Sequence, residues 1–235
     1  MGSYSHPEQL PYWQVNIAPE DREDECPEFL RGASNKDVRI IGTPDDEYRV
    51  QTWPQVVDII RTGRLADFQR WPSDLRKYRK YTWQLKRDHG SVMNFMLRKR
   101  LRWSEPVTPL GSKLFECQDD FKILMNDWPY GLDKRIVHLV VWTKFDLPDD
   151  HKTEAEIEAF VDKTFSPGVC QNKRIWFKNP PSLKSIHAVE HFHVMLFNPD
   201  PDFVQRVTKG DIPRCQRGMP TSDEGDEYDS PGRVG

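Results

Sequence analysis

The chain has 235 residues, a net charge of −3 and a mean hydropathy of −0.77, which indicates one medium-sized domain with a very polar surface. Its four cysteines are scattered, without a C-x-x-C pair, which argues against a zinc knuckle or a disulfide framework. No apolar run approaches the length of a membrane span, and the N-terminus has no apolar signal segment. We therefore expect a soluble, cytoplasmic protein with no membrane partner.

Charge is distributed unevenly along the chain. Residues 1–48 carry eleven acidic and four basic residues, whereas residues 64–103 carry twelve basic and three acidic residues. Residues 221–235 carry five acidic residues and one basic residue. A basic middle between acidic ends predicts a polyanionic partner for the middle of the chain.

Three helices are expected before the first strand, over residues 53–63, 73–90 and 91–103. Pro54 suits a first-turn position, and Ser73 and Ser91 are good N-caps. Gly63 and Gly90 follow the last residues of the helical period, where glycine commonly ends a helix.

The second and third of these helices are strongly basic. Acidic residues are nearly absent, so pairing between positions i and i+4 cannot account for the charge. One interpretation is a solvated helix face; the other is a surface that tracks phosphates, with interleaved aromatic side chains that either stack on bases or belong to the core. The candidate phosphate-binding residues are Arg76, Lys77, Arg79, Lys80, Lys86, Arg87, Arg98, Lys99, Arg100 and Arg102.

Strands dominate the second half of the chain. They are expected over residues 121–127, 136–145, 174–179 and 191–197, with helices over 153–165 and 200–208. This order predicts an α+β fold in which N-terminal helices pack on a small, mainly antiparallel sheet. The expected organisation is an acidic, weakly structured segment, a single α+β catalytic domain and a disordered acidic tail, over residues 1–49, 50–210 and 211–235.

The run Ser182–Phe197 is the part of the chain richest in reactive side chains, with three of the seven histidines. Strand alternation predicts that His191 and His193 share one face, with Glu190 and His187 just before them. Imidazole titrates near neutrality, so such a cluster suits proton transfer, metal binding or anion recognition. Histidines that are partly buried and bonded to the backbone are the structural alternative.

Cofactors are not indicated by any motif. The chain has no G-x-G-x-x-G sequence and no P-loop, so nothing supports binding of ATP or a dinucleotide. His191 and His193 form an H-x-H pair that suits a metal, with His187 as a third ligand. No further Cys or Asp stands at ligand spacing, however, and we predict neither a metal nor another cofactor.

Five segments in this order resemble a largely fungal family named after an N-acetylglucosamine-induced protein: PSDLRKYRKYTWQLKRDHGSVMNFMLRKRLRW, NDWPYG, RIVHLVVWTKF, IWFKN and SLKSIHAVEHFHVMLFNPDPDFV. The resemblance extends from Trp53 to Val207. That family includes the arginine-containing cyclodipeptide synthases of fungal secondary metabolism. The resemblance implies an aminoacyltransferase that takes arginine from arginyl-tRNA and a second residue from another aminoacyl-tRNA, and releases a cyclic dipeptide (a diketopiperazine). No ATP is then needed, because the aminoacyl ester is already activated.

If this resemblance extends to activity, the reaction needs a base for an ammonium proton and donors for an oxyanion. Glu190 is then the candidate base, with His187, His191 and His193 as proton carriers or oxyanion donors. A seryl acyl-enzyme at Ser182 or Ser185 stays open. The basic helices would bind tRNA.

A substrate guanidinium would need a carboxylate and aromatic walls. Asp127 beside Trp128 and Tyr130 is the best candidate, Glu190 competes for the role, and Asp133 is a weaker option. His138 and Trp142, which share a strand face, complete the candidate substrate-binding set. The alternative for the NDWPYG segment is a rigid structural turn.

A second hypothesis is a non-catalytic RNA-binding or regulatory protein of the same family. It uses the basic helices to hold RNA and predicts RNA affinity without a product.

Overall fold

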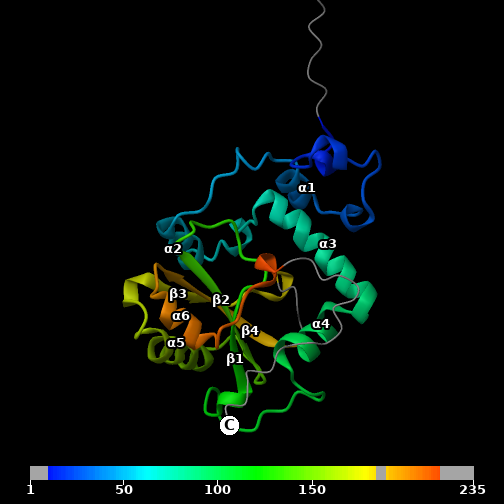
Figure 1. Cartoon of the computed structure of the whole chain (residues 1–235). Coiled ribbons are helices and arrows are strands. Elements are labelled where there is room, and N and C mark those ends of the chain that lie inside the picture. Colours follow the sequence, from blue (N-terminus) through cyan, green and yellow to red (C-terminus); the bar gives the residue numbers. More distant parts are fainter. Residues whose placement is uncertain (1–9, 184–188, 218–235) are drawn as a thin grey trace, which may run out of the picture.

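A four-stranded antiparallel sheet forms the centre of the computed structural model, which describes residues 10–183 and 189–217 (Figure 1). Its strands, in chain order, are β1 (Phe121–Met125), β2 (Ile136–Thr143), β3 (Arg174–Phe177) and β4 (Glu190–Phe197). They are arranged as β1-β2-β4-β3, and every neighbouring pair is antiparallel. The expected α+β class with a small antiparallel sheet is therefore confirmed.

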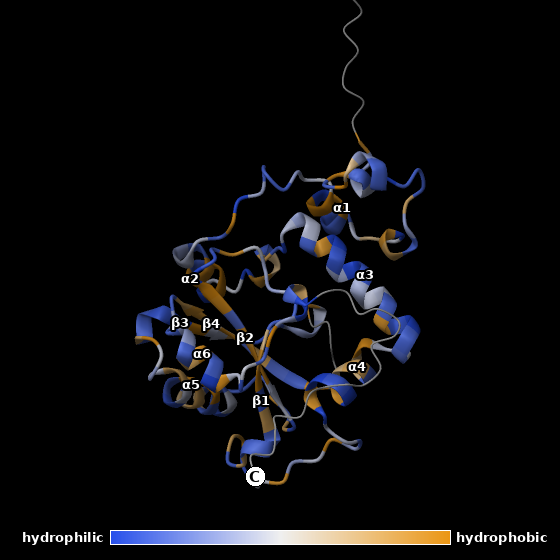
Figure 2. Cartoon of the chain, in the orientation of Figure 1, coloured by the Kyte–Doolittle hydropathy of each residue, from blue (hydrophilic) through white to orange (hydrophobic). Residues whose placement is uncertain are grey.

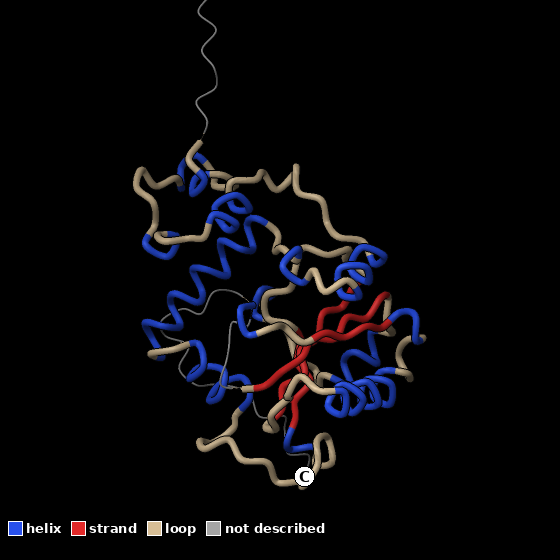
Figure 3. Tube along the Cα trace, turned by 180° about the vertical axis from the view of Figure 1, so that it is seen from behind, coloured by secondary structure: helices blue, strands red, loops and turns tan. Residues whose placement is uncertain are grey.

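Helices cover both faces of this sheet (Figures 1 and 3). The core face, where Leu139 and Val141 of β2 lie beside Phe192 and Val194 of β4, is buried under α5 (His151–Phe165) and α6 (Pro201–Val207). Side chains alternate along a strand, so the intervening residues point to the opposite face. This site face includes His138, Val140 and Trp142 of β2 together with His191 and His193 of β4.

Helix α2 (Trp53–Arg61) covers one end of the site face. It begins as the sequence predicts, because the side chain of Gln55 accepts a hydrogen bond from the backbone N–H of Thr52 and Pro54 lies in the first turn. Its buried residues Val56 and Ile59 pack with Phe177 and Met195 of the sheet.

Helices α3 (Pro72–His89) and α4 (Val92–Phe95) cover the other end of the site face. Gly90 ends α3 with a φ of 74°, a conformation that glycine adopts without strain. The hydroxyl of Ser91 accepts from the N–H of Asn94 and begins α4, as expected. The start of α3 differs from expectation: Pro72 is its first residue, and proline suits that position because it has no N–H to leave unsatisfied.

The expected helix over 91–103 is not a continuous α-helix. After α4 the chain widens into a π-helical turn (Met96–Leu101), and Arg102 ends it in the left-handed conformation with a φ of 51°. The wider turn buries Met96, Leu97 and Leu101 against the sheet. Figure 2 shows α3 coloured mostly as hydrophilic, whereas large parts of the strands are coloured as hydrophobic.

The N-terminal segment contains more structure than its acidic composition indicates. Residues 10–49 contain α1 (Asn35–Ile41), which packs beside α3 (Figure 1). Leu30, Ile40 and Ile41 are buried with Leu75 of α3. Single 3-10 turns, here and elsewhere, occupy Tyr12–Gln14, Pro19–Asp21, Glu28–Leu30, Leu65–Asp67, Gln118–Asp120, Gln171–Lys173, Pro181–Leu183 and Arg214–Gln216.

The folded part also extends beyond residue 210. Asp211 accepts hydrogen bonds from Arg100 and from the backbone N–H of Met125, and Cys215 N–H donates to the carbonyl of Asp127. The rest of the expected tail, residues 218–235, lies outside the described residues, as do residues 1–9. No helix in the described ranges combines the length and apolar character that crossing a membrane requires.

Candidate functional site

A cavity of about 150 Å³ lies between the site face and helices α3 and α4. A cavity of this size can enclose a group about as large as benzene. Its walls are mainly aromatic and aliphatic, but polar residues from several separate segments of the chain also line it. Those whose side chains matter below are Arg70, Tyr81, Arg100, Asp127, Trp128, Asn179, His191 and His193.

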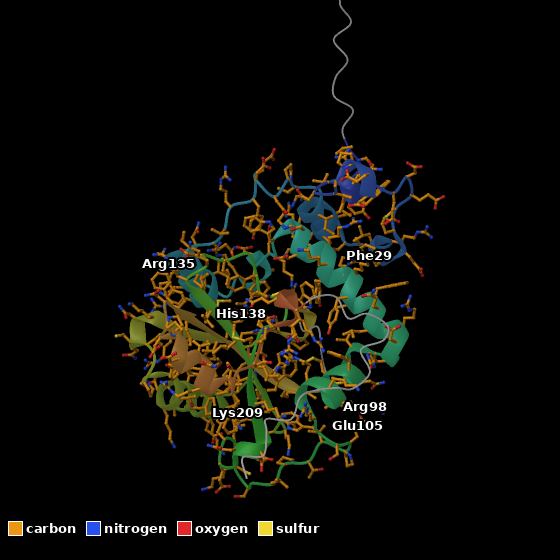
Figure 4. The ribbon with its side chains drawn as sticks, viewed as in Figure 1. Phe29, Arg98, Glu105, Arg135, His138 and Lys209 are labelled. Atoms are coloured by element: carbon orange, nitrogen blue, oxygen red, sulfur yellow. The ribbon has the colours of Figure 1, made fainter. Side chains whose placement is uncertain are left out.

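Two buried histidines form a hydrogen-bonded pair beneath the cavity. His138 Nε2 lies 3.0 Å from His193 Nδ1, and Asn179 Nδ2 lies 3.1 Å from His193 Nε2. Because the amide nitrogen donates, Nε2 of His193 accepts and its proton is on Nδ1, which donates to His138. Figure 4 shows His138 at the centre of the sheet.

Both imidazoles of this pair are neutral at neutral pH. Burial lowers the pKa of His138 to about 3, and the positive charge of Arg70 acts in the same direction. Burial, with the neighbouring His138 and His191, lowers the pKa of His193 well below its ordinary value. The pair therefore accepts and donates hydrogen bonds without adding charge to the cavity.

His191 lines the cavity with a defined tautomer. Its Nδ1 lies 3.0 Å from the carbonyl oxygen of Val189, which can only accept, so Nδ1 carries the proton. When the ring is neutral, its lone pair is therefore on Nε2. The ring packs on Trp142 with centroids 4.4 Å apart, and this contact fixes its plane. His191 thus has the geometry of a positioned general base.

The remaining catalytic candidates within the described residues, Glu190 and Ser182, do not line this cavity. Glu190 opens β4 opposite Thr143, and strand alternation directs it to the face opposite His191. It does not line the cavity. His187 and Ser185 lie outside the described residues, and Ser182 is an exposed residue of a 3-10 turn.

Asp127, the candidate for binding a substrate guanidinium, already binds one from within the chain. Arg100 donates from Nε to Oδ2 of Asp127 at 3.0 Å and from a terminal nitrogen to Oδ1 at 2.9 Å. Asp211 binds the same guanidinium at 2.7 and 2.9 Å. Burial alone lowers the pKa of Arg100, but its hydrogen bonds to Asp211 and the charge of Asp127 outweigh burial and raise that pKa.

Asp133 also has an internal partner. The guanidinium of Arg135 donates to both of its carboxylate oxygens, at 3.0 and 2.5 Å, and these bonds lower the pKa of Asp133 to about 2. A substrate guanidinium at either Asp127 or Asp133 would have to displace an arginine of the protein. The aromatic candidates for substrate binding do line the cavity: Trp128, Tyr130 and Trp142.

The ten basic candidates divide into two groups. Arg76, Arg79 and Arg100 are held inside the fold: Arg76 donates to the carbonyl of Trp13, and Arg79 pairs with Asp37 at 2.9 Å. The other members are exposed, and Figure 4 shows Arg98 at the outer surface of the helical layer. This exposed basic group comprises Lys77, Lys80, Lys86, Arg87, Arg98, Lys99 and Arg102.

Three residues that line the cavity each have one buried polar atom without a hydrogen-bond partner among the described residues: the Tyr81 hydroxyl, the Trp128 indole nitrogen and Asn179 Oδ1. Each of these residues is less than a tenth exposed. Unsatisfied buried polar groups are rare in proteins, and three of them around one cavity make it the candidate site. Arg70, Tyr81 and Asn179 were not among the sequence candidates, because no local pattern links segments so far apart in the chain.

Metal ligands are not gathered here or elsewhere in the described ranges. Within residues 10–183 and 189–217, no three His, Cys, Asp or Glu side chains are arranged to hold a metal ion.

Comparisons with known proteins place the cavity inside a shared region. A family model described as "Protein of unknown function (DUF3605)" matches residues 52–197, a range that contains every residue lining the cavity. N-acetylglucosamine-induced protein 1 of Candida albicans is 27% identical over 185 residues, which cover 68% of this chain and 73% of that protein. An uncharacterized protein of Saccharomyces cerevisiae is 30% identical over 172 residues, which cover 68% of this chain and 85% of that protein.

A solved structure shares the fold. The crystal structure of HTC1 aligns with a TM-score of 0.58 and 28% sequence identity, and the alignment covers 67% of this chain and 93% of that chain.

Proposed function

The chain belongs to the DUF3605 family of proteins of unknown function, and we propose that it is a tRNA-dependent aminoacyltransferase. It joins arginine from arginyl-tRNA and a second aminoacyl group from another aminoacyl-tRNA into a cyclic dipeptide. The observation that carries this proposal is a cavity in which the imidazole of His191 lies among unpartnered hydrogen-bonding groups. The resemblance of the five segments described above supplies the substrate class.

The reaction consists of two acyl transfers. In the first, the α-amine of one aminoacyl group attacks the ester carbonyl of the other, an amide bond forms, and the ester C–O bond to one tRNA breaks. In the second, the remaining amine attacks the remaining ester, which closes the ring and releases the second tRNA. Each ammonium must first lose one proton to solvent to become a nucleophilic amine. On attack its nitrogen loses a second proton, and the departing ribose oxygen gains one.

The residues of the cavity match these requirements. Nε2 of His191 takes the proton that the amine nitrogen loses on attack and passes it to the departing oxygen. The Trp128 indole N–H and the Tyr81 hydroxyl are donors for the developing oxyanion, and they act in a site where burial strengthens their effect. The geometry favours His191 over Glu190 as the base, because Glu190 does not line the cavity.

The exposed basic group supports a polynucleotide carrier. Its seven members follow α3 and the chain up to Arg102, the same elements that form one wall of the cavity. Lysine and arginine side chains on one layer attract the phosphates of RNA and release counterions when they bind.

The experiment is a product assay with the full chain. The protein is incubated with tRNA charged with isotopically labelled arginine and with unlabelled amino acids, and labelled cyclic dipeptides are sought by mass spectrometry. We expect such products, and His191→Gln should lower their rate about 100- to 10,000-fold, the usual contribution of a general base. The matched control is His151→Gln, since His151 is fully exposed on α5 and should not matter.

The assay also separates the two hypotheses. Labelled free arginine with uncharged tRNA should yield no product. If a folded protein binds charged tRNA but releases no cyclic dipeptide, the transferase proposal is wrong and a non-catalytic RNA-binding role takes its place.

A further inference from the structure

Arg70 enters the cavity from the segment between the turn Leu65–Asp67 and α3. Its Nε donates to the carbonyl oxygen of Trp128 at 3.0 Å. The guanidinium lies over the ring of Tyr78, 4.1 Å from its centroid, and 5.7 Å from that of Tyr130. One bond and two aromatic rings therefore fix the plane of the guanidinium and leave its two terminal nitrogens as donors.

The charge of Arg70 is not balanced within the described part of the chain. No carboxylate of residues 10–183 or 189–217 forms an ion pair with it, whereas Arg100, the other arginine of the cavity, is bound by both Asp127 and Asp211. Asp127 is the described carboxylate that lines the cavity, and it is fully engaged by Arg100 and the N–H of Arg214. The neutral imidazoles of His138 and His193 add no negative charge.

A second donor belongs to the residue whose carbonyl holds Arg70. Trp128 lines the cavity, and its indole nitrogen is buried without a hydrogen-bond partner among the described residues. An indole N–H can only donate. A ligand that satisfies both groups must offer acceptor atoms, and the positive charge of Arg70 favours acceptors that carry negative charge.

We propose that Arg70 and the Trp128 indole N–H form a binding site for the anionic group, a carboxylate or a phosphate, of a small ligand held in the cavity. The terminal nitrogens of Arg70 bind two oxygens of that group as a fork, and Trp128 donates to the group or to the atom next to it. The site shares the cavity and the Trp128 indole N–H with the proposed transferase, but it does not depend on that reaction: a protein that catalyses no aminoacyl transfer would still bind the anion.

Ligand pairs that differ only in charge test this site. One pair is AMP and adenosine, and the other is N-acetylarginine and its amide. Dissociation constants are measured with the full chain by calorimetry. The indole resonance of Trp128, assigned by its loss in Trp128→Phe, reports in NMR spectra whether each probe enters the cavity. We expect the anionic member of at least one pair to bind about 10- to 100-fold more tightly, as charge-assisted hydrogen bonds predict.

Variants of Arg70 separate recognition from folding. Arg70→Gln should abolish the preference for the anionic ligand and leave the affinity for the neutral ligand unchanged. Arg70→Lys keeps the charge but loses the two parallel N–H donors, so it should retain part of the preference for the anionic ligand. The matched control is Arg64→Gln, because Arg64 is an exposed arginine six residues earlier that pairs with Asp58 and Asp67. Thermal unfolding shows that each variant is folded.

The two probe pairs distinguish the sources of the anion. A preference in the AMP pair alone identifies a phosphate, such as that of an RNA end, and a preference in the N-acetylarginine pair alone identifies a carboxylate. The proposal is overturned if wild-type protein shows no preference in either pair, if the preference survives in Arg70→Gln, or if the Trp128 resonance does not respond.

Discussion

His138 and His193 meet diagonally across β2 and β4. His193 pairs with Val140 in the sheet register and His138 pairs with Met195, yet the two rings are joined by a 3.0 Å hydrogen bond. Diagonal neighbours on one face of a sheet are within reach of large side chains. The bond fixes a donor and an acceptor at the base of the cavity, and it cannot form when both rings are protonated.

Stability should therefore depend on the protonation of this pair. The pKa of both histidines is lowered in the folded chain, to about 3 for His138, whereas an unfolded chain titrates them near 6.5. Below pH 6.5 the unfolded state binds more protons, so the free energy of unfolding falls as the pH decreases. The slope should be about 1.4 kcal/mol per pH unit for each histidine.

Urea unfolding at several pH values between 6.5 and 4 measures this slope. The double variant His138→Phe, His193→Phe should lose it, whereas His151→Gln should keep it because His151 is exposed. A double variant with the slope of the wild type would show that the buried pair is not its source.

Removal of Arg100 should be costly. Arg100→Met leaves Asp127 and Asp211 buried without their cation, and breaking a buried ion pair typically costs about 3–5 kcal/mol. Arg98→Met, two residues away on the exposed side of the same turn, should change stability by less than about 0.5 kcal/mol. Denaturant unfolding measures the free energy of unfolding of both variants. Equal losses of stability would contradict the role assigned to the ion pairs of Arg100 with Asp127 and Asp211.

The exposed basic group should bind tRNA in a salt-dependent way. Reversing the charges of Lys80, Lys86 and Arg98 should weaken binding and lower the slope of log affinity against log salt by about 0.7–0.9 for each lost phosphate contact. Lys152→Glu is the control, since Lys152 is exposed on α5, across the sheet. Filter binding or fluorescence anisotropy over a salt series measures the slope, and equal slopes would exclude this surface.

Variants of the neighbours His191 and Glu190, which point to opposite faces of the sheet, test which face carries the catalytic base. His191→Gln should reduce product formation about 100-fold or more, the contribution of a general base. Glu190→Gln should cause a much smaller loss, because Glu190 points away from the cavity. Single-turnover rates with charged tRNA give the comparison, and the reverse order of effects would move the base to Glu190.

Local signals predicted local structure well. The alternation from His191 to Phe197 placed the two imidazoles on one face, Gly90 ended α3 and Ser91 began α4. Each of these depends on the backbone of a few neighbouring residues, so the pattern in the sequence is sufficient.

Long-range partners were not predictable in the same way. Asp127 was expected to bind a substrate, but its partner is Arg100, 27 positions earlier, and the pair is completed by Asp211, 111 positions after Arg100. The scarcity of acids within α3 suggested unpaired charge, yet Asp37 of α1 pairs with Arg79 across 42 positions. Spacing along one helix cannot reveal a partner that tertiary packing supplies.

The N-terminal segment shows the same limit. Helix α1 has seven residues, too few for a stable isolated helix, so its composition gave little sign of order. Burial of Ile40 and Ile41 against α3 supplies the missing stabilisation.

The pairing of β2 with β4 has a consequence for how the cavity can vary among related sequences. A slip of a single position between these strands would turn Phe192 and Val194 toward the cavity and carry both imidazoles into the apolar layer beneath α5. The register between β2 and β4 thus determines both the packing of that layer and the placement of the imidazoles. A substitution that loosens the apolar layer would therefore disturb the cavity even though it touches none of its walls.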